Sequence, residues 1–140
     1  MLFLCYGNSC RSILAEALAR HFRAGDMEAC SAGLFPLGHI TRHTLEALEE
    51  AGVSASGLYS KGLSDVRLDR VDYFVNLTEL DIGDFIPPLF SGRLISHYVR
   101  DPYGEGLDSF RAAREELKRF VMDVLPGLIA ESEEERARPL

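Results

Sequence analysis

The sequence lacks any long apolar run, since no stretch of its 140 residues approaches the ~18 residues that a membrane-spanning helix needs. It also lacks positive charge in excess, because its formal net charge is −7. That balance argues against a nucleic-acid-binding protein, which needs a basic face to displace counterions from phosphates. The four histidines show no metal-ligand spacing, so we expect no metal site, and nothing indicates another cofactor.

The chain also lacks a recognisable secretory signal, because its apolar start, Met1 to Leu4, is short and has no basic flank. We therefore expect a cytoplasmic protein with no membrane partner, in which the three cysteines stay reduced. No repeat or linker divides the chain, so residues 1–128 are predicted to form a single domain. Residues 129–140 contain the run ESEEER, and we expect them to be an acidic, frayed tail.

Segments with the patterns of strands and helices alternate along the chain. Short apolar or β-branched runs predict strands at residues 1–6, 27–31, 71–77 and 94–99, and apolar residues at helical spacing predict helices at residues 12–22, 41–51 and 109–125. This alternation is typical of an α/β domain with a parallel sheet. Ligands bind such sheets beyond the carboxyl ends of the strands, where residues 5–11 and Asp101 are expected to lie.

The run CYGNSCRS, residues 5–12, lies between a predicted strand and a predicted helix. Backbone N–H groups and the helix dipole favour an anion at this kind of junction. Gly7 and Asn8 both tolerate a positive φ, which lets successive N–H groups turn inward around an anion. Arg11 adds a planar fork that holds two phosphate oxygens at once. The run therefore predicts a phosphate-binding loop.

Cys5 opens this loop and is the candidate nucleophile. It lies in a positive field that favours the thiolate, and Ser12 is able to donate a hydrogen bond to its sulfur. The alternative is a buried structural cysteine beside a surface arginine. The order of strand, Cys, Gly-Asn, Arg-Ser and amphipathic helix argues against that alternative.

The segment from Cys5 to Glu16, CYGNSCRSILAE, resembles the phosphate-binding loop of the low-molecular-weight protein tyrosine phosphatase family and of the arsenate reductases that share its fold. Shorter matches are SAG at residues 31–33, AGV at residues 51–53 and DPYG at residues 101–104. With the alternation of elements, the expected fold is α/β and flavodoxin-like: a four-stranded parallel sheet in the order 2-1-3-4, with helices on both faces.

The resemblance also implies a role for individual residues. Cys5 is the implied nucleophile, which forms a cysteinyl-phosphate, and Asp101 is the implied acid that protonates the leaving oxygen and later activates water. The implied phosphate-binding residues are Tyr6, Gly7, Asn8, Ser9, Cys10, Arg11 and Ser12. Asn8, Ser12 and Ser31 are the implied supports of the loop, and Tyr103 is the implied aromatic wall for the substrate.

The remaining cysteines have less defined roles. Cys10 either forms a reversible disulfide that protects Cys5 from irreversible oxidation or packs beneath the loop, and the sequence leaves both interpretations open. Cys30 lies in a predicted strand and is expected to belong to the core.

The resemblance leaves two activities to distinguish. The main hypothesis is hydrolysis of phosphotyrosine in a phosphorylated protein, or of a small aryl phosphate. The alternative is arsenate reduction, in which an external thiol reductant is the partner. Reductases of this fold that couple to thioredoxin carry two further cysteines after the third strand, whereas residues 76–89 here contain none. A non-catalytic phosphate-binding module is disfavoured, because Cys5, Arg11 and Asp101 are all present.

Overall fold

Four parallel strands form the centre of the computed structural model, which describes residues 1–139. Their order is β2-β1-β3-β4, which confirms the predicted parallel sheet and its strand order. In the observed register, Phe3 of β1 pairs with Ser31 on one side and Val75 on the other. The strands are β1 (Leu2–Cys5), β2 (Cys30–Gly33), β3 (Tyr73–Asn76) and β4 (Arg93–Ser96).

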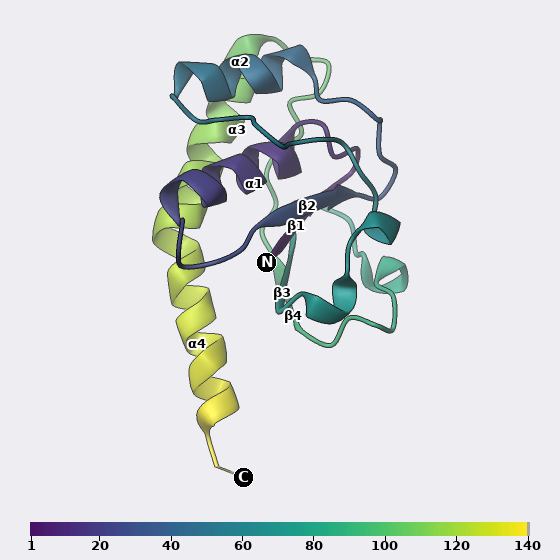
Figure 1. Cartoon of the computed structure of the whole chain (residues 1–140), viewed down its shortest axis with the longest axis vertical. Helices are drawn as coiled ribbons and strands as arrows, with labels where there is room; N and C mark the ends of the chain where they lie inside the picture. The colour runs from purple at the N-terminus through teal and green to yellow at the C-terminus, as the bar shows by residue number, and fades with distance from the viewer. Residues whose placement is uncertain (140) are drawn as a thin grey trace.

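Different elements pack on the two faces of the sheet, and both faces are buried (Figure 1). The α-helices gather on one face, and short 3₁₀ helices with their connecting loops cover the other. The α-helices are α1 (Arg11–Phe22), α2 (Arg42–Glu50), α3 (Leu107–Arg119) and α4 (Leu125–Ala137). The 3₁₀ helices are η1 (Leu63–Asp65), η2 (Leu68–Arg70) and η3 (Gly83–Phe85).

The alternation of side chains along the strands explains this division. Phe3 and Val75 point into the core beneath the α-helices, whereas Leu4 and Phe74 point into the core beneath the 3₁₀ helices. All four side chains are fully buried. Burial of each apolar side chain of this size contributes about 1.5–3 kcal/mol. Both cores fix the position of β1, the strand that ends at Cys5.

The acidic tail differs from its prediction. Residues 125–137 form helix α4, so the segment predicted to be frayed is helical as far as Ala137, and Leu140 lies outside the described residues. A five-residue π-helical turn, Phe120–Val124, connects α3 to α4, and Pro126 occupies the first turn of α4. Because proline has no N–H group, Pro126 donates no hydrogen bond to the preceding turn, and the helical hydrogen-bond pattern changes at this junction.

Side-chain contacts hold α4 against the domain. Leu128 and Ile129 pack on the core, and the hydroxyl of Tyr73 donates a 2.7 Å hydrogen bond to Oε1 of Glu133. An ion pair of 3.3 Å joins Arg93 to Glu135. The sequence prediction was wrong because it weighed the charge of this segment and overlooked its apolar contacts. No helix in residues 1–139 is both long and apolar enough to cross a bilayer.

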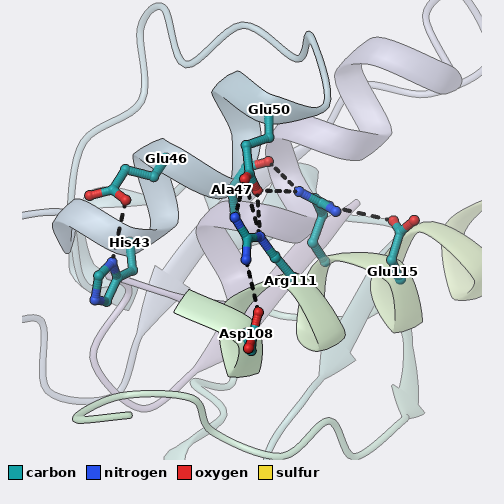
Figure 2. A network of polar contacts seen from close by, with 8 residues as sticks. His43, Glu46, Ala47, Glu50, Asp108, Arg111 and Glu115 are labelled. Carbon is teal, nitrogen blue, oxygen red and sulfur yellow. Dashed lines mark hydrogen bonds and ion pairs between the residues drawn. The ribbon is translucent and has the colours of Figure 1, made fainter. Parts of the chain in front are cut away.

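Helices α2 and α3 are joined by a network of charged side chains (Figure 2). Glu50 of α2 accepts hydrogen bonds from Arg111 and Arg114 of α3, and Arg114 also donates to the carbonyl oxygen of Ala47 at 2.9 Å. Hydrogen bonds from Arg111 lower the pKa of Glu50 to about 2. The network fixes α2, whose N-terminal end contacts the predicted phosphate-binding loop.

Candidate active site

The predicted loop connects the carboxyl end of β1 to the start of α1, as the sequence indicates. Asn8 adopts the left-handed conformation, with a φ of 48°. Gly7 is among the described residues without a positive φ, so its glycine is not needed for that conformation. Instead, a Cβ at Gly7 would lie 3.1 Å from Cγ of Leu37, and the missing side chain permits this close approach.

A hydrogen-bond chain of fixed polarity ends at the sulfur of Cys5. The carboxylate of Glu16 only accepts, so the hydroxyl of Ser31 donates to it at 2.5 Å. The amide nitrogen of Asn8 donates to Ser31 at 2.9 Å and to Ser12 at 2.7 Å. The proton of Ser12 is therefore free to point at the sulfur of Cys5, which lies 2.9 Å away. This arrangement stabilises a negative charge on the sulfur.

A hydrogen bond to its oxygen also fixes the orientation of the side-chain amide of Asn8. The backbone N–H of Lys61 donates to Oδ1 of Asn8 at 2.8 Å. The same lysine places its ammonium group 3.5 Å from the carboxylate of Glu16, which also pairs with Arg20. Glu16 and Lys61 are both buried, so the two cations offset the cost of a carboxylate under the loop.

Sequence reasoning assigned no role to Glu16, although a signal exists. Glu16 follows Ser12 by four residues, so both lie on the same face of α1. That face is buried. An acidic residue on the buried face of a helix needs a cationic or hydrogen-bonding partner, and this requirement identifies the site beneath the loop.

Arg11 lies beside the loop and is almost fully buried. Its Nη1 donates to the carbonyl oxygens of Leu77 and Val99, at 3.2 and 2.9 Å, beyond the ends of two neighbouring strands. Its Nε is buried and has no hydrogen-bond partner within residues 1–139. A buried donor of this kind needs an acceptor, and an oxyanion in the loop supplies one.

Asp101 lies next to this arginine, as the sequence predicts. Its Oδ2 is 3.5 Å from Nη2 of Arg11, and its Oδ1 accepts a 3.0 Å hydrogen bond from the backbone N–H of Tyr103. The side chain of Asp101 is 46% exposed, so a ligand in solution is able to reach its carboxyl group. The structure therefore brings a carboxyl group to the arginine from a position 90 residues along the chain.

A cavity of about 360 Å³ opens at this place. It is lined by Tyr6, Arg11, Thr78, Glu79, Leu80, Tyr98, Arg100, Asp101 and Glu105. Tyr103, the predicted aromatic wall, is not among the described lining residues, and its role stays a prediction; the tyrosines that line the cavity are Tyr6 and Tyr98. Tyr98 was missed because it lies beyond β4, where only the folded chain shows which side chains turn toward the loop.

A larger hollow, of about 1100 Å³, lies elsewhere and includes Arg20, Lys61 and Tyr73 in its lining. Arg11 does not line it, whereas Cys5 is among the described lining residues of neither hollow. We place the chemistry in the smaller cavity, because the candidate acid and the anion-binding arginine meet there.

Cys10 is buried and its thiol is free. Its sulfur is 3.5 Å from the hydroxyl of Thr41 and 3.6 Å from that of Ser9, and burial raises the pKa of the Cys10 thiol. Thr44 donates to the carbonyl oxygen of Ser9 at 2.8 Å, so the start of α2 braces the loop. The thiol therefore packs beneath the loop in this state, and a disulfide with Cys5 stays a prediction.

The third cysteine, Cys30, is only half-buried at the start of β2. Within residues 1–139, no three side chains of histidine, cysteine, aspartate or glutamate come together as ligands for a metal ion.

Comparison with known proteins agrees with this geometry. The family model for low molecular weight phosphotyrosine protein phosphatase matches residues 1–136. A glutaredoxin arsenate reductase from Synechocystis is 30% identical over 127 residues, which cover 89% of this chain and 95% of that protein. A protein-arginine-phosphatase from Bacillus subtilis is 29% identical over 147 residues, covering 91% and 95%. A solved arsenate reductase in the phosphate binding state has a TM-score of 0.76 at 28% identity, covering 93% and 95%.

Proposed function

The chain belongs to the low molecular weight phosphotyrosine protein phosphatase family, and we propose that it hydrolyses aryl phosphate monoesters, phosphotyrosine among them, through a cysteinyl-phosphate on Cys5. One observation carries this proposal. The buried, partly unpaired guanidinium of Arg11 lies between the loop that begins at Cys5 and the exposed carboxyl group of Asp101. A phosphate held there has a nucleophile on one side and a proton donor on the other.

Each residue then has a defined part in two steps. The thiolate of Cys5 attacks phosphorus, the bond from phosphorus to the aryl oxygen breaks, and Asp101 protonates that oxygen. A water molecule next gives its proton to Asp101 and attacks phosphorus, which breaks the sulfur–phosphorus bond and releases inorganic phosphate. Arg11 and the loop N–H groups hold the non-bridging oxygens throughout, and Ser12 donates to the departing sulfur.

The shape of the cavity supports an aromatic leaving group. Tyr6 and Tyr98 line it, and both rings are about half exposed. Aromatic rings pack favourably against a phenyl group in edge or offset geometry. Because a relative of similar length is a protein-arginine-phosphatase, matched phosphotyrosine and phosphoarginine peptides test this preference. We expect the higher kcat/KM with phosphotyrosine.

The Asp101→Asn variant tests the mechanism. We expect kcat/KM, which reports the step that forms the cysteinyl-phosphate, to fall across an aryl phosphate series by about 10²–10⁴ with poor leaving groups, the range typical of a general acid. The loss should shrink as the leaving phenol becomes more acidic, because a good leaving group needs no proton. Asp108→Asn, at an exposed position on α3, is the matched control. A loss of the same size with every leaving group would show that Asp101 is a structural residue.

Arsenate reduction is the second candidate, favoured by the full-length similarity to arsenate reductases. Cys5 would displace one arsenate oxygen as water and form a sulfur–arsenic bond; an external thiol would then attack the Cys5 sulfur, release arsenite and leave a mixed disulfide, which a second thiol would reduce to regenerate Cys5. Cys10 is turned toward Thr41 and Cys30 lies on another strand. With no cysteine in residues 76–89, we expect reduction with glutathione and glutaredoxin, or with thioredoxin, to be slow beside hydrolysis of p-nitrophenyl phosphate. Fast thioredoxin-driven reduction would reverse this order.

A further inference from the structure

Three aromatic rings form a row that leads away from the cavity. The ring of Tyr6 is 5.3 Å from that of Phe35, and the ring of Phe35 is 6.4 Å from that of Phe85. Their exposed fractions are 49%, 54% and 46%. We call Tyr6, Phe35 and Phe85 the aromatic shelf. Neighbouring half-exposed aromatic rings are typical of binding surfaces rather than of ordinary protein surface.

The shelf is fixed to the loop that carries the nucleophile. The backbone N–H of Phe35 donates to the carbonyl oxygen of Tyr6 at 2.9 Å, and that of Leu37 donates to the carbonyl oxygen of Gly7 at 2.9 Å. Tyr6 itself follows Cys5 directly. The rings of Tyr6 and Phe35 therefore have a defined position relative to the sulfur, and a ligand that spans both sites meets them already arranged.

Tyr6 belongs to both the shelf and the cavity. A ligand on the shelf is therefore continuous with a ligand in the cavity. A second copy of the chain lying across the shelf would cover Tyr6 and obstruct the route to Cys5. This continuity selects the substrate itself as the occupant.

We propose that the aromatic shelf binds the polypeptide next to the phosphorylated residue and selects substrates with an apolar side chain there. The proposal rests on the phosphatase function proposed above and names its substrate class: a phosphotyrosine polypeptide with an apolar neighbour. Partial burial of a leucine against the shelf should raise kcat/KM by about tenfold relative to serine, as transfer of part of a leucine side chain from water predicts.

The test compares two phosphotyrosine hexapeptides, one with leucine and one with serine on both sides of the phosphotyrosine. Wild-type protein should favour the leucine peptide by about tenfold in kcat/KM. Phe35→Ser, which removes the central ring, should lower this ratio to about twofold or less, and Phe85→Ser should lower it partly. Phe35→Leu should restore part of the preference. Met122→Ser removes an exposed apolar side chain outside the shelf and should keep the full ratio.

The outcomes separate this proposal from the proposed function. Failure of the wild type to hydrolyse p-nitrophenyl phosphate would refute phosphatase activity. In that case binding tests the shelf: the Kd values of the two peptides are measured with Cys5→Ser protein, and we expect their ratio to depend on Phe35 in the same way as the kcat/KM ratio. Equal values for the two peptides, or a ratio that survives Phe35→Ser, would refute the shelf. A wild-type dimer that Phe35→Ser dissociates, seen by sedimentation, would assign the rings to self-association and also refute it.

Discussion

Gly33 allows the phosphate-binding loop to lie against the end of β2. A Cβ at this position would be 2.7 Å from the backbone nitrogen of Asn8, 2.8 Å from the carbonyl carbon of Gly7 and 2.9 Å from the carbonyl oxygen of Tyr6. All three neighbours are backbone atoms, so no side chain is able to turn aside. Gly33→Ala therefore forces either the loop or the strand to move.

The strand has little freedom to move. Gly33 pairs with Cys5 in the parallel register, and its N–H donates to the carbonyl oxygen of Lys61 at 2.9 Å. The loop should therefore retreat by several tenths of an ångström and carry the N–H of Asn8 with it. Displacement on this scale should lower kcat/KM by about 10- to 100-fold, because a 1 Å misplacement costs about 10²-fold. The overpacked contact should also lower the free energy of unfolding by about 1–3 kcal/mol.

Three measurements test this reasoning: kcat/KM for p-nitrophenyl phosphate, the inhibition constant of inorganic phosphate, and urea unfolding. Inhibition by phosphate should weaken together with kcat/KM, because the displaced N–H groups bind the anion. Gly92→Ala is the matched control, since its Cβ would collide with the backbone carbonyl of Asp72, outside the site. It should lose stability and keep kcat/KM. Wild-type kcat/KM and phosphate inhibition in Gly33→Ala, despite a comparable loss of stability, would refute the argument.

Two further predictions concern the charged networks. Lys61→Met leaves Arg20 as the ionic partner of the buried Glu16 carboxylate among residues 1–139, so the free energy of unfolding measured in urea should fall by about 1–3 kcal/mol. An unchanged value would show that the Lys61 ammonium group does not stabilise the carboxylate beneath the loop. Hydrogen bonds from Arg111 hold the pKa of Glu50 at about 2 in the folded state, below its usual 4.5. Between pH 4.5 and pH 2 the Glu50 carboxylate takes up a proton more readily in the unfolded chain than in the folded protein. The contribution of Glu50 to the free energy of unfolding is therefore present above pH 4.5 and is lost as the pH falls toward 2. The urea midpoint should show a smaller decrease over this range for Glu50→Gln than for the wild type, and equal decreases would contradict the assignment.

The sequence predicted those parts of the site that are local in the chain. Cys5, Asn8, Arg11 and Ser12 lie within eight residues between one strand and one helix, so backbone geometry brings them to one loop without any distant contact. The strand order followed from the family resemblance. The place of Asp101 was predictable because parallel strands all end at the same edge of a sheet. In the structure, Asp101 does reach Arg11 at that edge.

The tertiary structure decided what depends on register and on the paths of distant loops. Lys61 reaches Asn8 and Glu16 from a loop of the chain far from both, and no spacing in the sequence indicates that meeting. For the same reason the sequence did not indicate that Tyr98 lines the cavity beside Arg11.

The end of the chain shows the same distinction between local pattern and packing. The charges of residues 131–136 indicate a solvated segment, and they do not indicate how Leu128 and Ile129 pack. Helix α4 is held against the domain because its apolar side chains pack on the core and Glu133 accepts a hydrogen bond from Tyr73. Charge and local spacing are properties of neighbouring residues, so the sequence by itself determined the position of the loop between β1 and α1. Long-range packing depends on which surfaces meet in space. Only the folded structure therefore showed which side chains lie beneath the loop, which residues line the cavity and that residues 125–137 form a helix.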